Sequence, residues 1–163
     1  MQKRVQKPEL EAGDGRGAQR HGKRQQQSEH TKALFLKAAE EIFIRDGFEA
    51  AKLEEIASKA GYTRGAFYAN FESKEDLFLD VAEIHIQRLV ESLKQTAKSW
   101  QSHSPVRRLD ALREHFMNSA KERNWTIIGL ELKLFSLRHP ELKTKIAALR
   151  ARAFAAAVTV INE

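Results

Sequence analysis

Three polar side chains between Arg64 and Asn70 have the chemistry to bind a polyanion or to read a base edge. Arg64 offers a guanidinium, Tyr68 a phenol and Asn70 an amide, and each can form hydrogen bonds with phosphate oxygens or base pairs. Gly65 and Ala66 are small, so the backbone there could approach a partner closely. An exposed helix face of this composition is typical of a DNA recognition helix.

The chain offers little for catalysis. It contains no cysteine, so it has no thiolate nucleophile and no cysteine ligand for zinc. It also contains no G-x-S-x-G motif and no glycine-rich phosphate loop. His85, His103, His115 and His139 lack the i, i+4 pairing of a zinc-binding helix. We therefore expect a protein that is not an enzyme and uses no metal or cofactor.

Two short helices are predicted to position the polar face. Apolar residues within 53–60 recur at intervals of three and four, which places them on one buried face of a helix. Gly61 stands where a helix commonly ends in a left-handed residue, and Thr63 has the type and position of the next N-cap. Phe67 and Phe71, four residues apart, supply the inner face of the second helix. The pattern indicates a helix-turn-helix.

A long helix is predicted directly after this corner. Ser73 and Asp76 form an S-x-x-D capping box that starts a helix from Lys74 to about Ser99. Lys74 stands in the first turn, where outward-pointing amides already favour an anion, so we expect it to contact a DNA phosphate. The apolar residues along this helix should connect the DNA-binding head, residues 30–76, to the C-terminal half of the chain. They are Leu77, Phe78, Val81, Ile84, Leu89 and Leu93.

The residues between Phe35 and Leu77 form a more specific pattern than a helix-turn-helix alone. They include Ala38, Ala39, Phe43, Gly47, Phe48, Ile56, Ala57, Gly61, Gly65, Tyr68, Phe71, Ser73, Lys74 and Glu75. This run resembles the DNA-binding domain of the tetracycline-repressor (TetR) family of transcriptional regulators. It departs from the family at Lys52, where a Thr or Ser usually caps the second helix, and losing such a cap costs about 1 kcal/mol.

The resemblance implies roles for particular residues. Arg64 and Asn70 would read bases, and Tyr68 and Lys74 would bind phosphates. The predicted DNA-binding set is Thr63, Arg64, Gly65, Ala66, Tyr68, Asn70, Lys74 and Lys52. The resemblance also implies a second domain that encloses a small, mostly apolar effector of unknown identity. Four aromatic residues could line such a pocket, although the core is the more usual place for aromatic residues at helical intervals: Trp100, Phe116, Trp125 and Phe135.

Residues 1–29 are predicted to be a disordered basic tail, because they contain almost no aliphatic residues and several glycines. Seven basic residues stand against four acidic ones in this segment. A basic arm beside a helix-turn-helix can follow DNA phosphates or enter the minor groove. The alternative is a solvated tail without a partner.

The remaining pattern predicts an all-α chain. The first helix should run from about Thr31 to Asp46, with Gly47 ending it. Ser104 and Pro105 predict a helix start, and further helices are expected over 105–123, 125–137 and 141–161. We expect a helix-turn-helix DNA-binding domain at 30–76 and a helical effector-binding and dimerisation domain at 77–163, with the connecting helix at 74–99.

Composition limits the partners and the compartment. The chain carries 28 basic and 22 acidic residues, a balance that favours a polyanionic partner. No apolar run approaches the roughly 20 residues that span a bilayer, and the N-terminus lacks the apolar core of a secretory signal. Together with the absence of cysteine, this predicts a cytoplasmic protein without a membrane partner.

The function expected from these features is sequence-specific transcriptional regulation. By the resemblance, the protein would be a ligand-responsive repressor that binds a palindromic operator as a homodimer. The family usually continues with two further helices that build the dimer interface, and no residues follow Glu163 in this sequence to form them. Either the chain is truncated or divergent, or residues 125–163 provide the dimer surface. The alternative function is a helical interaction protein that pairs with another regulator and has weak or vestigial DNA binding.

Overall fold

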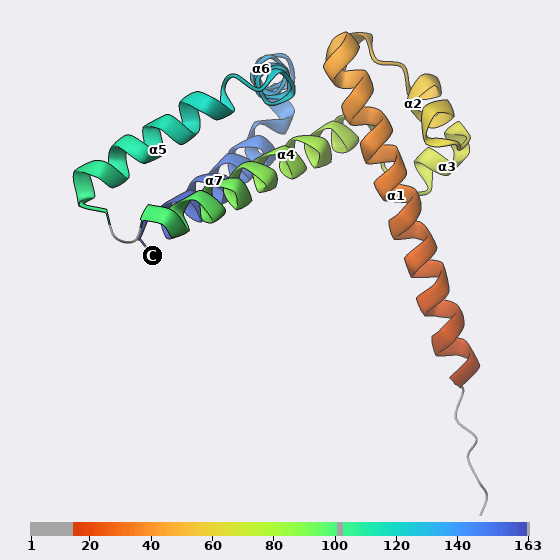
Figure 1. The fold of residues 1–163 in the computed structure, drawn as a ribbon. Helices are drawn as coiled ribbons and strands as arrows, with labels where there is room; N and C mark the ends of the chain where they lie inside the picture. Colours follow the sequence, from red (N-terminus) through yellow and green to blue (C-terminus); the bar gives the residue numbers. More distant parts are fainter. Residues whose placement is uncertain (1–14, 101–102, 163) are drawn as a thin grey trace, which may run out of the picture.

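The computed structural model describes residues 15–100 and 103–162, and no β-strand occurs among them (Figure 1). The all-α prediction is confirmed. The elements in chain order are α1 (Gly15–Ala50), α2 (Leu53–Ala60), α3 (Arg64–Tyr68), α4 (Lys74–Ala97), the short 3₁₀ helix η1 (Lys98–Trp100), α5 (Pro105–Ser119), α6 (Arg123–Arg138), η2 (Pro140–Leu142) and α7 (Lys143–Asn162).

Helix α1 begins earlier than the sequence predicted. We expected a start near Thr31 after a disordered tail, but the helix starts at Gly15. The prediction of disorder is therefore wrong from Gly15 onward, while residues 1–14 lie outside the described residues. The physical reason is that the packed part of α1 is already helical, and adding turns to an existing helix requires no new nucleus.

Gly47 interrupts α1 near its end. Its backbone has φ 79° and ψ 167°, a conformation that an L side chain rarely adopts. The predicted helix end at this glycine is therefore confirmed as a break in the helix, and the last few residues of α1 follow it in a new direction.

Helices α4 and α7 form the long axis of the second half of the molecule and lie side by side (Figure 1). The predicted capping box is confirmed, because the Asp76 N–H donates to Ser73 Oγ over 3.0 Å. Helix α5 runs above α4 and α7, and α6 connects it back toward α1. Pro105 opens α5 as expected, whereas the side chain of Ser104 makes no capping hydrogen bond.

One continuous core joins the first three helices to the rest of the chain. Phenylalanines dominate it, because rings from α1, α3, α4 and α6 meet where these helices cross. The buried core does not stop at residue 76, so the two-domain division stays a prediction. Its largest fully buried side chains include Phe35, Phe43, Phe67, Phe78, Phe135, Ile42, Ile56, Leu77, Ile128 and Ile146.

A second, smaller apolar cluster lies near the far end of α4. Leu93 and Trp100 are buried there, and Ala97, Ala111 and Leu112 pack against them. Within residues 15–100 and 103–162, no helix has the length and apolar character needed to cross a membrane.

Candidate nucleic-acid interface

The corner between α2 and α3 has the geometry that the sequence predicted. Gly61 adopts a left-handed conformation with φ 81° and ψ 23°. Its N–H bonds to the Ser58 carbonyl over 3.0 Å, and the next residue, Tyr62, donates to the Ala57 carbonyl over 2.9 Å. Thr63 caps α3, because its hydroxyl accepts from the Ala66 N–H over 3.4 Å. These bonds fix the angle at which α3 leaves α2.

Two phenylalanines hold α3 against α1. Phe67 is 0% exposed and Phe71 is 5% exposed, and the Phe35 ring contacts both at centroid distances of 5.7 and 6.1 Å. The predicted inner face is therefore confirmed. Since the inner face is fully occupied, the opposite side of this short helix must face outward.

The outward side of α3 carries the polar residues expected to meet DNA. Arg64 and Gly65 are exposed, and Tyr68 is 51% exposed. Arg64 Nη1 pairs with Glu54 Oε1 over 2.7 Å, and Nη2 donates to the Tyr68 hydroxyl over 3.2 Å. The guanidinium is thus held above the surface by α2 and by its own helix. A phosphate or base edge that binds it would compete with the Glu54 carboxylate.

Asn70 is engaged in contacts that the sequence did not predict. Its Nδ2 donates to the Ala66 carbonyl over 2.8 Å, and its Oδ1 accepts from the Ser28 hydroxyl over 3.1 Å. Both polar atoms of the Asn70 amide thus bond within the protein, and the base-reading role of Asn70 stays a prediction. Ser28 lies beside Asn70 because α1 begins well before Thr31, and no sequence pattern indicated this contact.

Lys74 also makes contacts that the sequence did not predict. Its ammonium donates to three carbonyl oxygens at the end of α1 and just after it, those of Phe48 at 2.9 Å, Glu49 at 3.3 Å and Ala51 at 3.1 Å. It also lies 4.4 Å from the centroid of the Phe48 ring. Its three donors satisfy carbonyls at the end of α1 and just after it, and the predicted phosphate contact of Lys74 stays a prediction.

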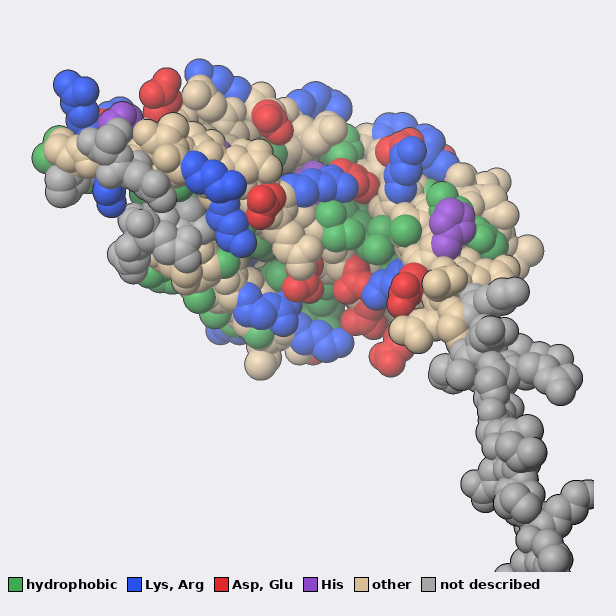
Figure 2. All heavy atoms as spheres, turned by 60° about the horizontal axis from the view of Figure 1, so that its bottom comes forward, with side chains coloured by type: hydrophobic (Ala, Val, Ile, Leu, Met, Phe, Trp, Pro, Cys, Tyr) green, Lys and Arg blue, Asp and Glu red, His purple; other side chains and the backbone are tan. Residues whose placement is uncertain are grey.

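The remaining predicted contact residues differ in how far they are exposed. Lys52 is exposed beside the start of α2, and α2 lacks a side-chain cap there, as the sequence predicted. Ala66 is half-buried and packs against the core, so it offers less room for close approach than Gly65. Figure 2 shows acidic side chains interspersed among the basic ones, so net charge alone does not mark the interface.

Helix α6 contacts the DNA-binding head directly. The Glu131 carboxylate accepts from the Phe48 N–H over 3.0 Å, and a Cβ added at Gly47 would meet Glu131 Oε1 at 3.0 Å. Phe135 and His139 pack on the Phe48 ring at centroid distances of 4.8 and 5.7 Å. No sequence signal indicated this contact, which spans 83 residues.

A polar group links α1 to the connecting helix α4. Glu40 on α1 bonds to His85 Nε2 over 2.8 Å and to Arg88 Nη1 over 2.6 Å. Burial alone would raise the pKa of Glu40, but the hydrogen bonds and charges of Arg88 and His85 together outweigh it, and the pKa lies below its usual value. Burial lowers the pKa of His85, and the attraction of Glu40 does not offset it. Near neutral pH the group is therefore a Glu40–Arg88 ion pair with an uncharged imidazole.

The four aromatic residues proposed for an effector pocket are not brought together. Trp100 is buried in the small apolar cluster, and Phe135 is 1% exposed in the main core. Phe116 is 42% exposed on α5, and Trp125 contributes to the lining of a hollow together with residues of α1 and α4. Among the described residues, no group of three His, Asp or Glu side chains could hold a metal ion.

The segment with this geometry is similar in sequence to known transcriptional regulators. A family model described as "Bacterial regulatory proteins, tetR family" matches residues 35–81, the segment that contains the corner and α3. The HTH-type transcriptional activator FasR of Mycolicibacterium smegmatis is 35% identical over 83 residues, which are 51% of this chain and 37% of that protein. The HTH-type transcriptional repressor BepR of Brucella suis is 45% identical over 51 residues, 31% of this chain and 24% of that protein. The chain thus matches about a third of the length of these curated relatives.

Solved structures share the fold over more of the chain. SCO7518 from Streptomyces coelicolor A3(2) superposes with a TM-score of 0.69 at 14% identity, covering 80% of this chain and 73% of that one. A TetR family transcription regulator from Marinobacter aquaeolei VT8 gives a TM-score of 0.62 at 19% identity, covering 85% and 68%. These likenesses show a common helical fold over most of the described chain.

Proposed function

We propose that the chain is a sequence-specific DNA-binding transcriptional regulator of the tetR family, whose family model matches residues 35–81. The observation that carries this proposal is the outward face of α3, where Arg64, Gly65 and Tyr68 are exposed on a helix locked from behind by Phe67 and Phe71. Small and hydrogen-bonding residues on a rigidly held short helix suit entry into the major groove.

The proposed roles follow from the contacts of each side chain. Arg64 reads a base or binds a phosphate after leaving Glu54, and Tyr68 supplies a phenol beside it. Lys52 is an exposed cation at the start of α2 and would bind a phosphate. Lys74 and Asn70 are assigned to support, because their polar atoms bond within the protein and hold α3 and α1 in place.

The first turns of α1 are proposed as an additional DNA arm. They extend from the head beyond α3, and the Ser28 hydroxyl bonds to Asn70 at the end of α3 (Figure 1). Residues 24–30 are exposed, so the body of the protein does not cover this part of the helix. The basic excess of the segment suits phosphates that flank the half-site.

We further propose that the protein acts in the cytoplasm as a homodimeric repressor. A two-fold dimer would place two copies of α3 in successive major grooves about 34 Å apart on a palindromic operator. Exposed apolar side chains on α6 and α7 support contact with another protein surface. They are Leu130, Leu134, Leu137, Phe154 and Val158.

Selection of bound DNA from a random pool tests this function. Enrichment of two inverted half-sites with a constant spacing would support a dimeric sequence-specific regulator. Arg64→Ala should lower affinity for the selected site by about 1–3 kcal/mol and relax one base position. Arg113→Ala, at an exposed position on α5, is the matched control and should bind as the wild type. Absence of any enriched sequence would contradict the proposal.

A further inference from the structure

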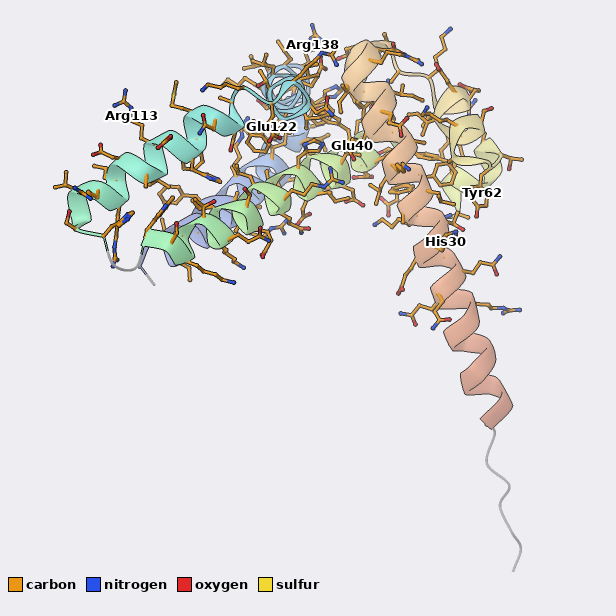
Figure 3. The ribbon with its side chains drawn as sticks, viewed as in Figure 1. His30, Glu40, Tyr62, Arg113, Glu122 and Arg138 are labelled. Atoms are coloured by element: carbon orange, nitrogen blue, oxygen red, sulfur yellow. The ribbon has the colours of Figure 1, made fainter. Side chains whose placement is uncertain are left out.

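Glu54, in the first turn of α2, lies on the same surface as the outward face of α3. Its carboxylate pairs with Arg64 over 2.7 Å, and the side chains of Glu54 and Arg64 are 63% and 57% exposed. In Figure 3, α2 and α3, joined at the labelled Tyr62, lie on one side of α1, and α5 and α6 lie on the other. The rest of the protein therefore leaves this ion pair open to a large partner.

The ion pair presents unused donors and an unused acceptor next to each other. The Arg64 guanidinium donates to Glu54 Oε1 and, over 3.2 Å, to the Tyr68 hydroxyl, and it has further N–H donors beyond these two. Arg64 Cζ also lies 5.7 Å from the centroid of the Tyr68 ring, so the phenol restrains the guanidinium from a second direction. Among the described residues, none donates a hydrogen bond to the second carboxylate oxygen of Glu54.

The major-groove edge of a G·C base pair has the complementary arrangement. Guanine offers two neighbouring acceptors, N7 and O6, and the N4 amino group of the paired cytosine is a donor beside O6. An arginine binds both guanine acceptors at once, and a glutamate accepts from the cytosine amino group. An A·T pair places a donor, adenine N6, between two acceptors, so it cannot match both side chains in this way.

A phosphate fits the same two side chains less well than this base pair does. An ion pair between exposed side chains is weak, so either ligand can draw Arg64 away from Glu54. When Arg64 turns to a phosphate, the Glu54 carboxylate is left beside a second anion and gains no donor. On a G·C pair, the released carboxylate gains the cytosine amino group instead. Glu54 thus weakens phosphate contacts while favouring the matching base pair, and this difference is specificity.

We propose that Glu54 is a specificity-determining residue, and that Glu54 and Arg64 together read one G·C base pair in each half-site. Arg64 binds the guanine, and Glu54 accepts from the amino group of the paired cytosine. The assignment rests on the proposed function, and it makes Arg64 a base-reading residue rather than a phosphate-binding one. It also adds the start of α2 to the surface that recognises the sequence.

Selection of bound DNA from a random pool, repeated with Glu54→Ala and with Arg64→Ala, tests whether both residues read the same base pair. We expect a G·C pair in the wild-type half-site, and each variant should lose a preference of about tenfold at that same position. Glu55→Ala is the matched control, because Glu55 is the next residue in the same turn of α2 and pairs with Arg45 of α1 instead. It removes an equal charge and should keep the wild-type base preference.

The salt dependence of binding to random-sequence DNA tests whether Glu54 weakens phosphate contacts. In Glu54→Ala, Arg64 is free to neutralise a phosphate, so the slope of log affinity against log salt should steepen by about one unit for each bound protomer. Affinity for random-sequence DNA at low salt should rise several-fold. The double variant with alanine at both positions lacks the cation and should not gain this slope.

Three results would overturn the assignment: no relaxed base position in Glu54→Ala, relaxation of different base pairs in Glu54→Ala and Arg64→Ala, or an unchanged salt slope in Glu54→Ala. Both side chains are exposed, so the variants should fold as the wild type does, and far-ultraviolet circular dichroism checks this. Enrichment of a constant site by the wild type together with any of the three results would leave the proposed function intact. Failure of the wild type to enrich any sequence would contradict the proposed function and this assignment with it.

Discussion

Replacing Lys74 by Met tests whether this lysine stabilises the DNA-binding head or binds a DNA phosphate. The ammonium donates to the carbonyls of Phe48, Glu49 and Ala51 at 2.9–3.3 Å, and methionine keeps most of the aliphatic stem while removing all three donors. The variant therefore tests the hydrogen bonds with little change in packing against the Phe48 ring.

The expected loss of stability can be worked from these contacts. A hydrogen bond from a charged donor contributes about 1.5–3 kcal/mol, but the Lys74 site is only half-buried and water can replace some of the bonds. We therefore expect a total loss of about 2–3 kcal/mol for the three bonds together. For a chain of this size, that lowers the Tm by roughly 5–10 °C.

Two measurements check the reasoning about Lys74. Thermal unfolding followed by circular dichroism should show the lower Tm, whereas Lys98→Met, at an exposed position in η1, should unfold with the wild type. The salt dependence of DNA binding should keep its slope in Lys74→Met. An unchanged Tm together with a slope about one unit flatter would refute the supporting role and restore a phosphate contact.

Three further outcomes are expected from the same structure. Gly61→Ala should lower the free energy of unfolding in urea by about 1–2 kcal/mol because the φ of Gly61 is 81°, whereas Gly65→Ala in helix α3 should not destabilise the protein. A larger loss of stability in Gly65→Ala than in Gly61→Ala would contradict the geometry of the corner. Burial lowers the pKa of His85 in the folded protein below its ordinary value of 6.5, so the stability it contributes is complete above pH 6.5 and is lost as the pH falls through the folded-state pKa. His85→Gln should therefore unfold with a flatter dependence of stability on pH below about 6.5. Equal pH profiles for the variant and the wild type would count against this. Glu131→Ala leaves the Phe48 N–H without its partner and should cost about 1–2 kcal/mol in urea unfolding, and no loss would mean that water replaces the carboxylate.

The sequence by itself determined the parts of the head that depend on short-range contacts. The left-handed Gly61, the caps at Thr63 and Ser73 and the burial of Phe67 and Phe71 all follow from residues three or four positions apart. Such interactions are settled by local backbone geometry, so residue type and spacing were enough to place them.

Only the tertiary structure decided what the polar side chains of the head bind. Lys74 reaches carbonyls 23–26 residues earlier, and Asn70 meets Ser28 across 42 residues. Glu131 caps the Phe48 N–H across 83 residues. These partners come from separate helices, and they meet only because the packing of the shared core sets the position of each helix. A residue's type shows which bonds it can form, whereas the packed arrangement of the helices selects which of them it does form.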